Sequence, residues 1–336
     1  MKRDDFADID TKTPSVARGY DYALGGTDNY AVDRAAMDQA ENMLPGTMAM
    51  TRNGRRFLER VVGYLAADCG IRQFVDSGSG LPTQNNVHQI AQRIAPDSRV
   101  VYVDNDAVVI RHQKVSALAE NAGTAFILAD ARDIEQILDH PDTRRLIDFS
   151  QPAAALYLGF LHHIPDEDDP WSMVRRMMDR LAPGSYLAIS HLASDEVEVR
   201  RLMTQFITEG TRGNFGRVRT KQEVSRFFDG LQPVEPGLVE LTGWRPDGRD
   251  EPQTLPYASP EPPHHHRDMA AAIQPPLRAA TPPILGSPDP RPSARGRLRP
   301  ARLVSFQPDC PEDQQNRDVD PYGLGSHPTP RNSRDR

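Results

Sequence analysis

The chain has 336 residues, 38% of them hydrophobic, with a mean hydropathy of −0.60 and a net charge of −7 at pH 7. Its apolar runs are too short for a membrane-spanning helix, which needs roughly 18 apolar residues, and residues 1–6 lack the apolar core of a signal peptide. An acidic chain is repelled by nucleic acid and by anionic lipid surfaces. These properties predict a cytoplasmic protein with neither kind of partner, and they leave its oligomeric state open.

Charge and proline are unevenly distributed along the chain. From Asp250 onward, 11 arginines balance 11 acidic residues, so the part before it carries the whole net charge of −7. More than half of the 30 prolines also lie in this region. Such a composition cannot bury enough apolar surface to fold. We therefore predict a folded part that ends at 247 and a disordered tail over 248–336.

Neither a disulfide nor a metal site is expected. The two cysteines, Cys69 and Cys310, lie in regions of different character, one near the end of a predicted helix and one in the polar tail. Three histidines at 264–266 stand side by side, without the spacing of a dedicated metal site.

Residues 1–17 are polar and are predicted to be flexible, and a helical segment is predicted over 18–70. Its first part, 18–30, is rich in tyrosine, glycine and aspartate. Either this part is a short helix that ends at a glycine, or it is a lid over a ligand site, because aromatic faces suit a flat cationic ligand and glycines allow a hinge. Apolar residues at helical spacing then predict two helices, over 31–44 and 51–67.

A regular alternation of apolar strands and amphipathic helices begins at Ile71. Strands are predicted over 71–76, 100–103, 125–128, 153–158, 185–189 and 238–244. Helices are predicted over 84–95, 107–120, 134–138, 171–181 and 220–231. Apolar strands that alternate with helices indicate a parallel sheet buried on both faces. The predicted fold is therefore α/β, with a doubly wound, mostly parallel, Rossmann-like sheet over residues 71–247.

The first strand ends in an acid and a glycine-rich turn over 76–80, with the sequence Asp-Ser-Gly-Ser-Gly. Glycine permits a positive φ and lets a ligand approach the backbone, and the helix that follows offers unpaired N–H groups. The next two strands end in Asp104 and Asp130. Ligands of a doubly wound sheet bind outside the carboxyl ends of its strands. The pattern therefore predicts a nucleotide or nucleoside site, in which Asp104 would accept hydrogen bonds from the ribose hydroxyls.

Two observations separate a dinucleotide from a nucleoside that carries a sulfonium group. A pyrophosphate-binding turn has a third glycine or alanine where this chain has Thr83. The turn also lacks Lys and Arg and is surrounded by acids, which repel a pyrophosphate and tolerate an ammonium and a sulfonium. The sulfonium nucleoside is therefore favoured, and an NAD(P)-dependent dehydrogenase is the alternative.

Four blocks, over 20–30, 73–88, 101–106 and 161–166, read YDYALGGTDNY, QFVDSGSGLPTQNNVH, VYVDND and LHHIPD. In this order they resemble a family of actinobacterial S-adenosylmethionine-dependent methyltransferases, over residues 14–247. The resemblance implies the class I methyltransferase fold with seven strands. It also implies S-adenosylmethionine as the cofactor and S-adenosylhomocysteine as its product.

The resemblance further implies where the cofactor lies. Its methionine part would lie over the turn, its ribose at Asp104, and its adenine near Asp130 and Ala131, and the first block would close over it as a lid. The implied contacts are Asp76, Ser77, Gly78, Ser79, Gly80, Asp104, Asn105, Asp130, Ala131, Gly159, Tyr20, Tyr22, Gly25 and Asn29. Among them we expect Asp76 to face the ammonium group.

Methyl transfer is an in-line displacement at the sulfonium methyl group, so the protein mainly aligns the reactants and, where needed, removes a proton. His162 is the first candidate for a base or an acceptor contact, and His163, His191, Tyr20 and Asp21 are weaker candidates. His163 stands where the family usually has an aromatic residue. The acceptor is expected to be an unidentified small molecule. A regulatory protein that binds S-adenosylmethionine without catalysis is a further alternative.

The end of the chain departs from the family. Members close soon after the residues that are 244–247 here, whereas this chain continues into the Pro- and Arg-rich tail. No convincing strand is visible in it. We therefore predict that the seventh strand is missing or degenerate and that the tail is a divergent or frame-shifted extension.

Overall fold

The computed structural model describes residues 10–82, 85–106, 109, 121–211, 215–252 and 269–274, the last of these by their backbone alone. The chain divides into two units, residues 1–282 and 283–336, and every described residue belongs to the first. The helix predicted over 107–120 (except Val109), Thr83, Cys310 and the histidines at 264–266 lie outside the described residues.

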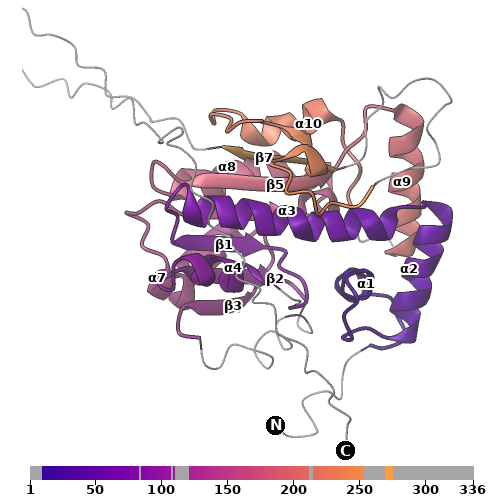
Figure 1. The fold of residues 1–336 in the computed structure, drawn as a ribbon, viewed down its shortest axis with the longest axis horizontal. Coiled ribbons are helices and arrows are strands. Elements are labelled where there is room, and N and C mark those ends of the chain that lie inside the picture. Colours follow the sequence, from indigo (N-terminus) through magenta and orange to yellow (C-terminus); the bar gives the residue numbers. More distant parts are fainter. Residues whose placement is uncertain are drawn as a thin grey trace, which may run out of the picture. The chain divides into compact units, whose positions relative to one another are not determined.

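The described unit is built on one seven-stranded sheet with the order β3-β2-β1-β4-β5-β7-β6. The first five strands, which pair in parallel, are β1 (Gln73–Ser77), β2 (Arg99–Asp104), β3 (Thr124–Leu128), β4 (Ala154–Leu158) and β5 (Tyr186–Leu192). The last two are β6 (Val239–Glu240) and β7 (Met269–Gln274). The predicted doubly wound, mostly parallel α/β fold is confirmed (Figure 1).

The prediction of a missing seventh strand was wrong. β7 pairs antiparallel with β5, from Leu187 opposite Gln274 to Leu192 opposite Met269, and with β6 on its other side. Its sequence, MAAAIQ, has little strand propensity, and it lies among prolines. Strand formation depends on the neighbours that the strand packs against more than on propensity. The open edge of β5 supplies that context, and the folded part extends beyond 247.

Three helices precede β1: α1 (Val16–Ala23), α2 (Ala31–Met43) and α3 (Thr47–Ala67). Between the strands, the described helices are α4 (Val87–Ile94), α6 (Ile134–Asp139), α7 (Pro141–Leu146), α8 (Pro170–Arg180), α9 (Val197–Gly210) and α10 (Lys221–Ser225). The sequence did not predict α7 and α9, and α10 is shorter than its predicted range because a 3₁₀ turn follows at Arg226–Phe228. Within the described residues, no helix has both the length and the apolar character that crossing a membrane requires.

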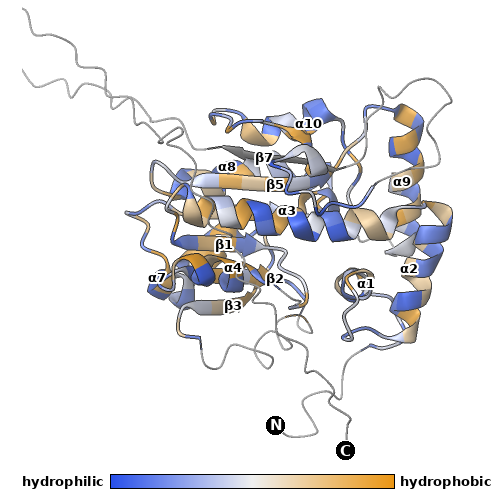
Figure 2. Cartoon of the chain, viewed as in Figure 1, coloured by the Kyte–Doolittle hydropathy of each residue, from blue (hydrophilic) through white to orange (hydrophobic). Residues whose placement is uncertain are grey.

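Alternate side chains of the five parallel strands enter two apolar layers, one on each face of the sheet. Along β1, Phe74 packs in the layer covered by α3 and α4, and Val75 packs in the layer covered by α6, α8 and α10. Figure 2 shows apolar colour in the middle of β1 and hydrophilic colour towards its end, beside the mixed polar and apolar turns of α3. Because both faces are covered, ligands can approach the parallel strands only at their ends.

Candidate functional site

The turn after β1 places two glycines in conformations that other residues rarely adopt. Gly78 has φ 76° and Gly80 has φ 65°. A Cβ atom at Gly78 would collide with the ring of Phe160, which follows β4, whereas a Cβ at Gly80 would meet no atom of the described residues within 4 Å. The first glycine therefore allows the turn to pack against Phe160, and at the second the described residues leave room for a side-chain atom.

The amide groups of this turn bond to the end of β2. Gly78 N and Ser79 N donate to Val103 O at 2.9 and 3.2 Å, and Gly80 N donates to Asp104 Oδ2 at 2.9 Å. The helix predicted to begin at 84 begins at Val87, where Asn86 and Gln89 form a capping box. At this helix start, Asn86 N donates to Gln89 Oε1 at 2.8 Å and His88 N donates to the Tyr102 hydroxyl at 2.9 Å, so these two N–H groups already have acceptors.

Asp104 joins the turn to the next strand. Its Oδ1 accepts a hydrogen bond from Asp106 N at 2.9 Å, in addition to the bond from Gly80 N to Oδ2. Burial raises the pKa of its carboxyl above the usual value, although these backbone N–H groups oppose the shift. Each carboxylate oxygen accepts about two hydrogen bonds. Asp104 is thus oriented by the backbone and keeps acceptor capacity for a hydroxyl group.

A small cavity lies beside the turn, between α3, β1 and α4. Its lining consists of Arg55, Asp76, Ser79, Pro82, Asn86, Val87, His88, Tyr102 and Phe126. Asp76 is only 5% exposed, and burial raises the pKa of its carboxyl to about 7, which the charge of Asp104 increases and the guanidinium of Arg55 opposes. The cavity therefore contains a carboxyl that is costly to ionise unless a cation lies next to it.

Sequence reasoning missed two features of this cavity. Arg55 comes from α3, whose polar positions show no local sign of a ligand. Tyr102 in β2 stacks on Phe126 with ring centroids 4.8 Å apart, and its hydroxyl accepts a hydrogen bond from His88 N at 2.9 Å. Paired strands bring Asp76 and Tyr102 to the same level of the sheet. Only the parallel register could have indicated this contact, because the residues lie far apart in sequence.

The third strand-end acid makes an ion pair. Arg132 Nε donates to Asp130 Oδ1 at 2.9 Å, and the same guanidinium also pairs with Asp168. The neighbouring cation lowers the pKa of Asp130 below its usual value. Ala131 is buried, and Asn105 after β2 is exposed. A role for Asp130, Ala131 and Asn105 in binding adenine or ribose stays a prediction.

Residues of the N-terminal segment 18–30 mainly contact each other, α2 and α3. Tyr22 donates to Asp38 at 3.1 Å, Asn29 Nδ2 donates to Asp21 at 2.8 Å, and Tyr20 donates to Thr51 O at 3.3 Å. Gly25, with φ 78°, is in the turn that ends α1. Of the two sequence interpretations, the short helix with a glycine turn describes these residues. Their contact with a ligand stays a prediction.

The histidines after β4 and in β5 form a buried group. Nδ1 of His162 accepts a hydrogen bond from Leu192 N at 3.4 Å. His191 Nε2 accepts one from Arg219 at 2.9 Å. Burial, together with nearby positive charges, holds the pKa of His162 well below its usual value and lowers that of His191 to about 3. Both rings are therefore neutral at pH 7, and backbone contacts occupy the nitrogen of His162 that a base would use.

His163 lies nearer the surface. It is half-buried, and its ring centroid is 4.6 Å from that of His162 and 5.4 Å from that of Phe215. Gly159 precedes this group at the end of β4, with φ 69°, and a Cβ added to it would meet no described atom within 4 Å. His163 and Gly159 are thus partly exposed positions after β4, unlike the buried His162.

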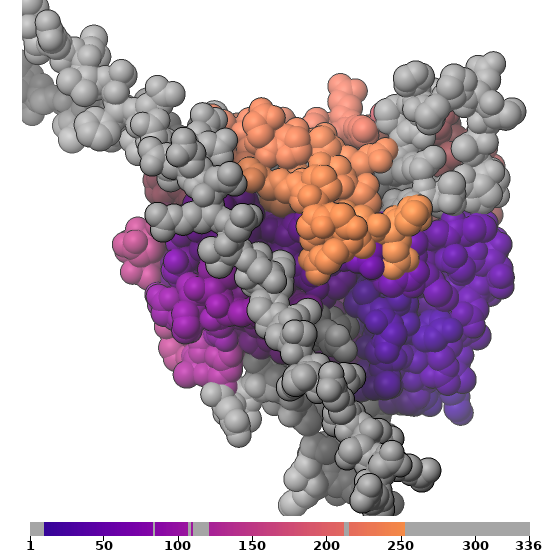
Figure 3. Space-filling view, viewed as in Figure 1, coloured from indigo at the N-terminus to yellow at the C-terminus, as the bar shows by residue number. Residues whose placement is uncertain are grey.

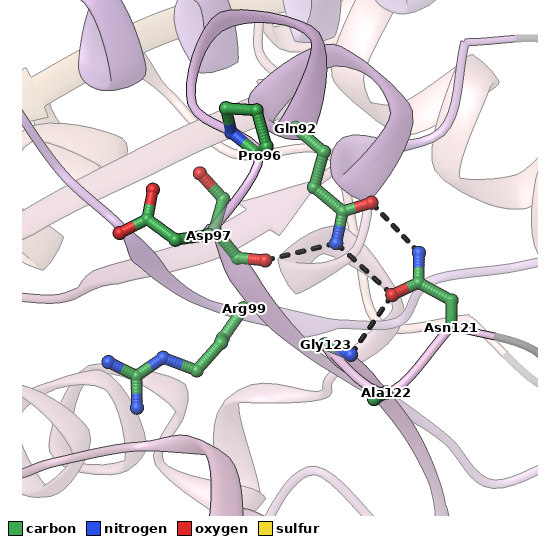
Figure 4. A pocket seen from close by; sticks show the side chains of 8 residues that line it. Gln92, Pro96, Asp97, Arg99, Asn121, Ala122 and Gly123 are labelled. Atoms are coloured by element: carbon green, nitrogen blue, oxygen red, sulfur yellow. Dashed lines mark hydrogen bonds between the residues drawn. The ribbon is translucent and has the colours of Figure 1, made fainter.

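A wider hollow lies at the other end of the strands. It is lined by Gln92, Pro96, Asp97, Ser98, Arg99, Asn121, Ala122 and Gly123 (Figure 4). Arg99 begins β2, and Gly123 immediately precedes β3. The amide groups of Gln92 and Asn121 bond to each other at 2.8 and 3.2 Å. The hollow is at the amino ends of the strands, away from the glycine turn, and its amides already have partners.

Comparisons with known proteins agree with this geometry. A crystallised protein of Thermobifida fusca, assigned as a methyltransferase, has a TM-score of 0.70 and 39% identity, over 80% of this chain and 96% of that one. A DUF574-family protein of Streptomyces avermitilis has a TM-score of 0.70 and 37% identity, over 80% of this chain and 100% of that one. No curated protein matches the chain.

A protein-family model described as S-adenosyl methyltransferase matches residues 2–271. This match covers most of the chain, including the first residues of β7, and it favours a methyltransferase over the dehydrogenase alternative. The chain therefore belongs to the S-adenosyl methyltransferase family, whose members are enzymes that use S-adenosylmethionine.

Proposed function

We propose that the protein transfers the sulfonium methyl group of S-adenosylmethionine to a small-molecule acceptor, with the cofactor at the carboxyl ends of β1, β2 and β3. The main support is the turn after β1. No atom of the described residues lies within 4 Å of a Cβ placed at Gly80, and two carboxyls, Asp76 and Asp104, stand on either side of the turn. The proposed position agrees with the general location of ligands in doubly wound sheets.

The chemistry of these residues fits the cofactor. S-adenosylmethionine carries two positive charges, on its ammonium and sulfonium groups, and two carboxyls at the turn favour such a ligand. Asp104, oriented by Gly80 N, would accept hydrogen bonds from the ribose hydroxyls. Asp76 would accept hydrogen bonds from the ammonium group, which supplies the cation that its buried carboxyl needs.

The bound cofactor supplies an electrophilic methyl group, so this chain need only orient the acceptor and exclude water. His163 and Gly159 border the end of β4 and would contact the acceptor there. His162 is less suited to take a proton, because its ring is buried and Nδ1 already accepts from Leu192 N.

A small acceptor and a cytoplasmic location are parts of the proposal. The net charge of −7 lies in the folded part, which disfavours a nucleic-acid acceptor. The chain contains only two cysteines, as is usual in a reducing compartment.

Calorimetry and a methyl-transfer assay test the proposal. We expect S-adenosylmethionine and S-adenosylhomocysteine to bind and NAD not to bind. A labelled methyl group should then move to a member of a small-molecule library, while nucleic acid and protein stay unlabelled. Tight binding of NAD alone would contradict the proposal. Binding of both adenosyl compounds without transfer to any acceptor would instead favour a regulatory role.

A further inference from the structure

We propose that Arg55 binds the carboxylate of the amino-acid part of the cofactor while Asp76 binds its ammonium group, so that the cavity beside the glycine turn recognises a zwitterion. The inference rests on the proposed cofactor position and adds a residue that the strand-end pattern does not contain. Arg55 comes from α3 and Asp76 from β1, and both line the same cavity with Ser79. The positive Arg55 and the negative Asp76 match the carboxylate and the ammonium group of an amino acid.

Contacts around Arg55 fix the direction of its guanidinium. Nη2 donates to Asn86 Oδ1 at 3.1 Å, and Asn86 also begins α4 through its capping box. Arg55 thus extends from α3 across to the start of α4, above the end of β1. A guanidinium has five N–H donors in a planar fork, which suits two parallel hydrogen bonds to a carboxylate.

The charges that line the cavity also fit a ligand with both signs. Asp76 is 5% exposed, with Tyr102 opposite it in the sheet, and Asp104 lies at the next strand end. Burial of the carboxyl raises its pKa, which Arg55 only partly offsets. Arg55 and Asp76 carry opposite charges, so the cavity offers a partner for an anionic group and a partner for a cationic group. A zwitterion can use both partners.

The neighbours of Arg55 exclude water from one side of the cavity. Tyr102, stacked on Phe126, and Val87 form an apolar wall. Tyr20, which donates to Thr51 O on the same helix as Arg55, lies near its charge, since Arg55 influences the phenol of Tyr20 electrostatically. Hydrogen bonds between charged groups are stronger where water is excluded. Arg55 is therefore placed to recognise the amino-acid part of the cofactor.

The test uses calorimetry on the full chain with three ligands. They are S-adenosylhomocysteine, the analogue without its carboxylate and the analogue without its ammonium group. We expect Arg55→Gln to weaken binding of S-adenosylhomocysteine about 10- to 100-fold and binding of the analogue without a carboxylate less than about 3-fold. Asp76→Asn should weaken binding of S-adenosylhomocysteine, whereas it should change the affinity for the analogue without an ammonium group only slightly.

Arg144→Gln is the matched control. It removes the same charge from α7, where Arg144 is 61% exposed and pairs with Asp139, and it should leave all three affinities unchanged. Equal losses for Arg55→Gln with all three ligands would overturn the inference, because Arg55 would then act on the fold. The wild-type protein gives a second test that needs no variant: equal affinity for S-adenosylhomocysteine and the analogue without a carboxylate would also overturn it. Failure of the wild type to bind any of the three would contradict the proposed function instead.

Discussion

Gly78 and Gly80 have similar backbone conformations but different surroundings. Gly78→Ala adds a Cβ that collides with Phe160 at a φ of 76°, whereas Gly80→Ala adds only the strain of a φ of 65°. We expect Gly78→Ala to lower the free energy of unfolding by about 2–4 kcal/mol and Gly80→Ala by about 1 kcal/mol. Urea unfolding measures both. Equal losses would show that Phe160 moves aside without cost.

The carboxyl of Asp76 should make stability depend on pH. Its folded pKa of about 7 lies above the ordinary value of 3.8, so the folded state binds the proton more tightly than the unfolded state. The free energy of unfolding therefore falls as the pH rises from about 4 to 7, through ionisation of a buried group. Between about pH 5 and about pH 8, we expect the free energy of unfolding of the wild type to fall by on the order of 2 kcal/mol more than that of Asp76→Asn. If the free energy of unfolding changed with pH in the same way in both proteins, the carboxyl of Asp76 would be ionised throughout this range.

At the scale of elements, Arg219 connects β5 to the segment after β4. The side chain is fully buried and donates to Leu161 O at 2.9 Å, to Ile164 O at 2.8 Å and to Asp166 at 2.8 Å. Its guanidinium also lies over the ring of Trp171, at 5.1 Å. These contacts hold both ends of the short 3₁₀ turn Leu161–His163 that presents His163. Arg219 is thus a positioning residue for this part of the site.

Arg219→Met should destabilise the protein strongly, because two buried carbonyl groups lose their donor. We expect a loss of about 2–4 kcal/mol in the free energy of unfolding. Arg217→Met is the control: Arg217 also pairs with Asp166, at 2.7 Å, but its side chain is 30% exposed, and a loss of about 1 kcal/mol or less is expected. If urea unfolding showed similar losses of stability for Arg219→Met and Arg217→Met, the effect would come from the ion pair with Asp166 and not from the carbonyl groups.

At the scale of the whole folded unit, the segment Leu241–Glu251 is attached to the N-terminal helices. Arg60 in α3 donates to Leu241 O and Trp244 O and pairs with Asp250 at 2.9 Å. Glu251 pairs with Arg52, whose Nη1 donates to Ala23 O at the end of α1. In Figure 3 this orange segment covers the purple surface of α3. The C-terminal segment therefore holds α1 and α3, the helix of Arg55, in place.

Two shortened chains test this attachment. A chain that ends at 282 keeps Glu251 and β7, and we expect it to unfold cooperatively and to bind S-adenosylhomocysteine as the full chain does. A chain that ends at 247 loses the ion pairs of Glu251 and Asp250 and leaves the edge of β5 open, so it should unfold at least about 5 °C lower and tend to aggregate. Thermal unfolding with light scattering compares them. Equal unfolding temperatures would show that the segment after 247 contributes nothing to stability.

Much of the fold and the position of the candidate turn follow from the sequence alone. The alternation of apolar strands and helices determines a parallel sheet, because apolar side chains on both faces of a strand require cover on both sides. The turn at 78–80 and the acids Asp76 and Asp104 are recognisable, because a strand followed by glycines constrains the local backbone. The resemblance of four short blocks identifies the family, which the comparisons confirm.

Tertiary structure decided the rest. The sequence places Arg55 in a helix and His162 after a strand, but packing directs Arg55 into the cavity of Asp76 and buries His162 against Leu192 N. β7 was invisible because its six residues have weak strand propensity, and it forms only where the edge of β5 accepts its backbone hydrogen bonds. Local patterns determine which elements form. The partner of a buried charge or of a sheet edge comes from a distant part of the chain, so only the assembled fold reveals it.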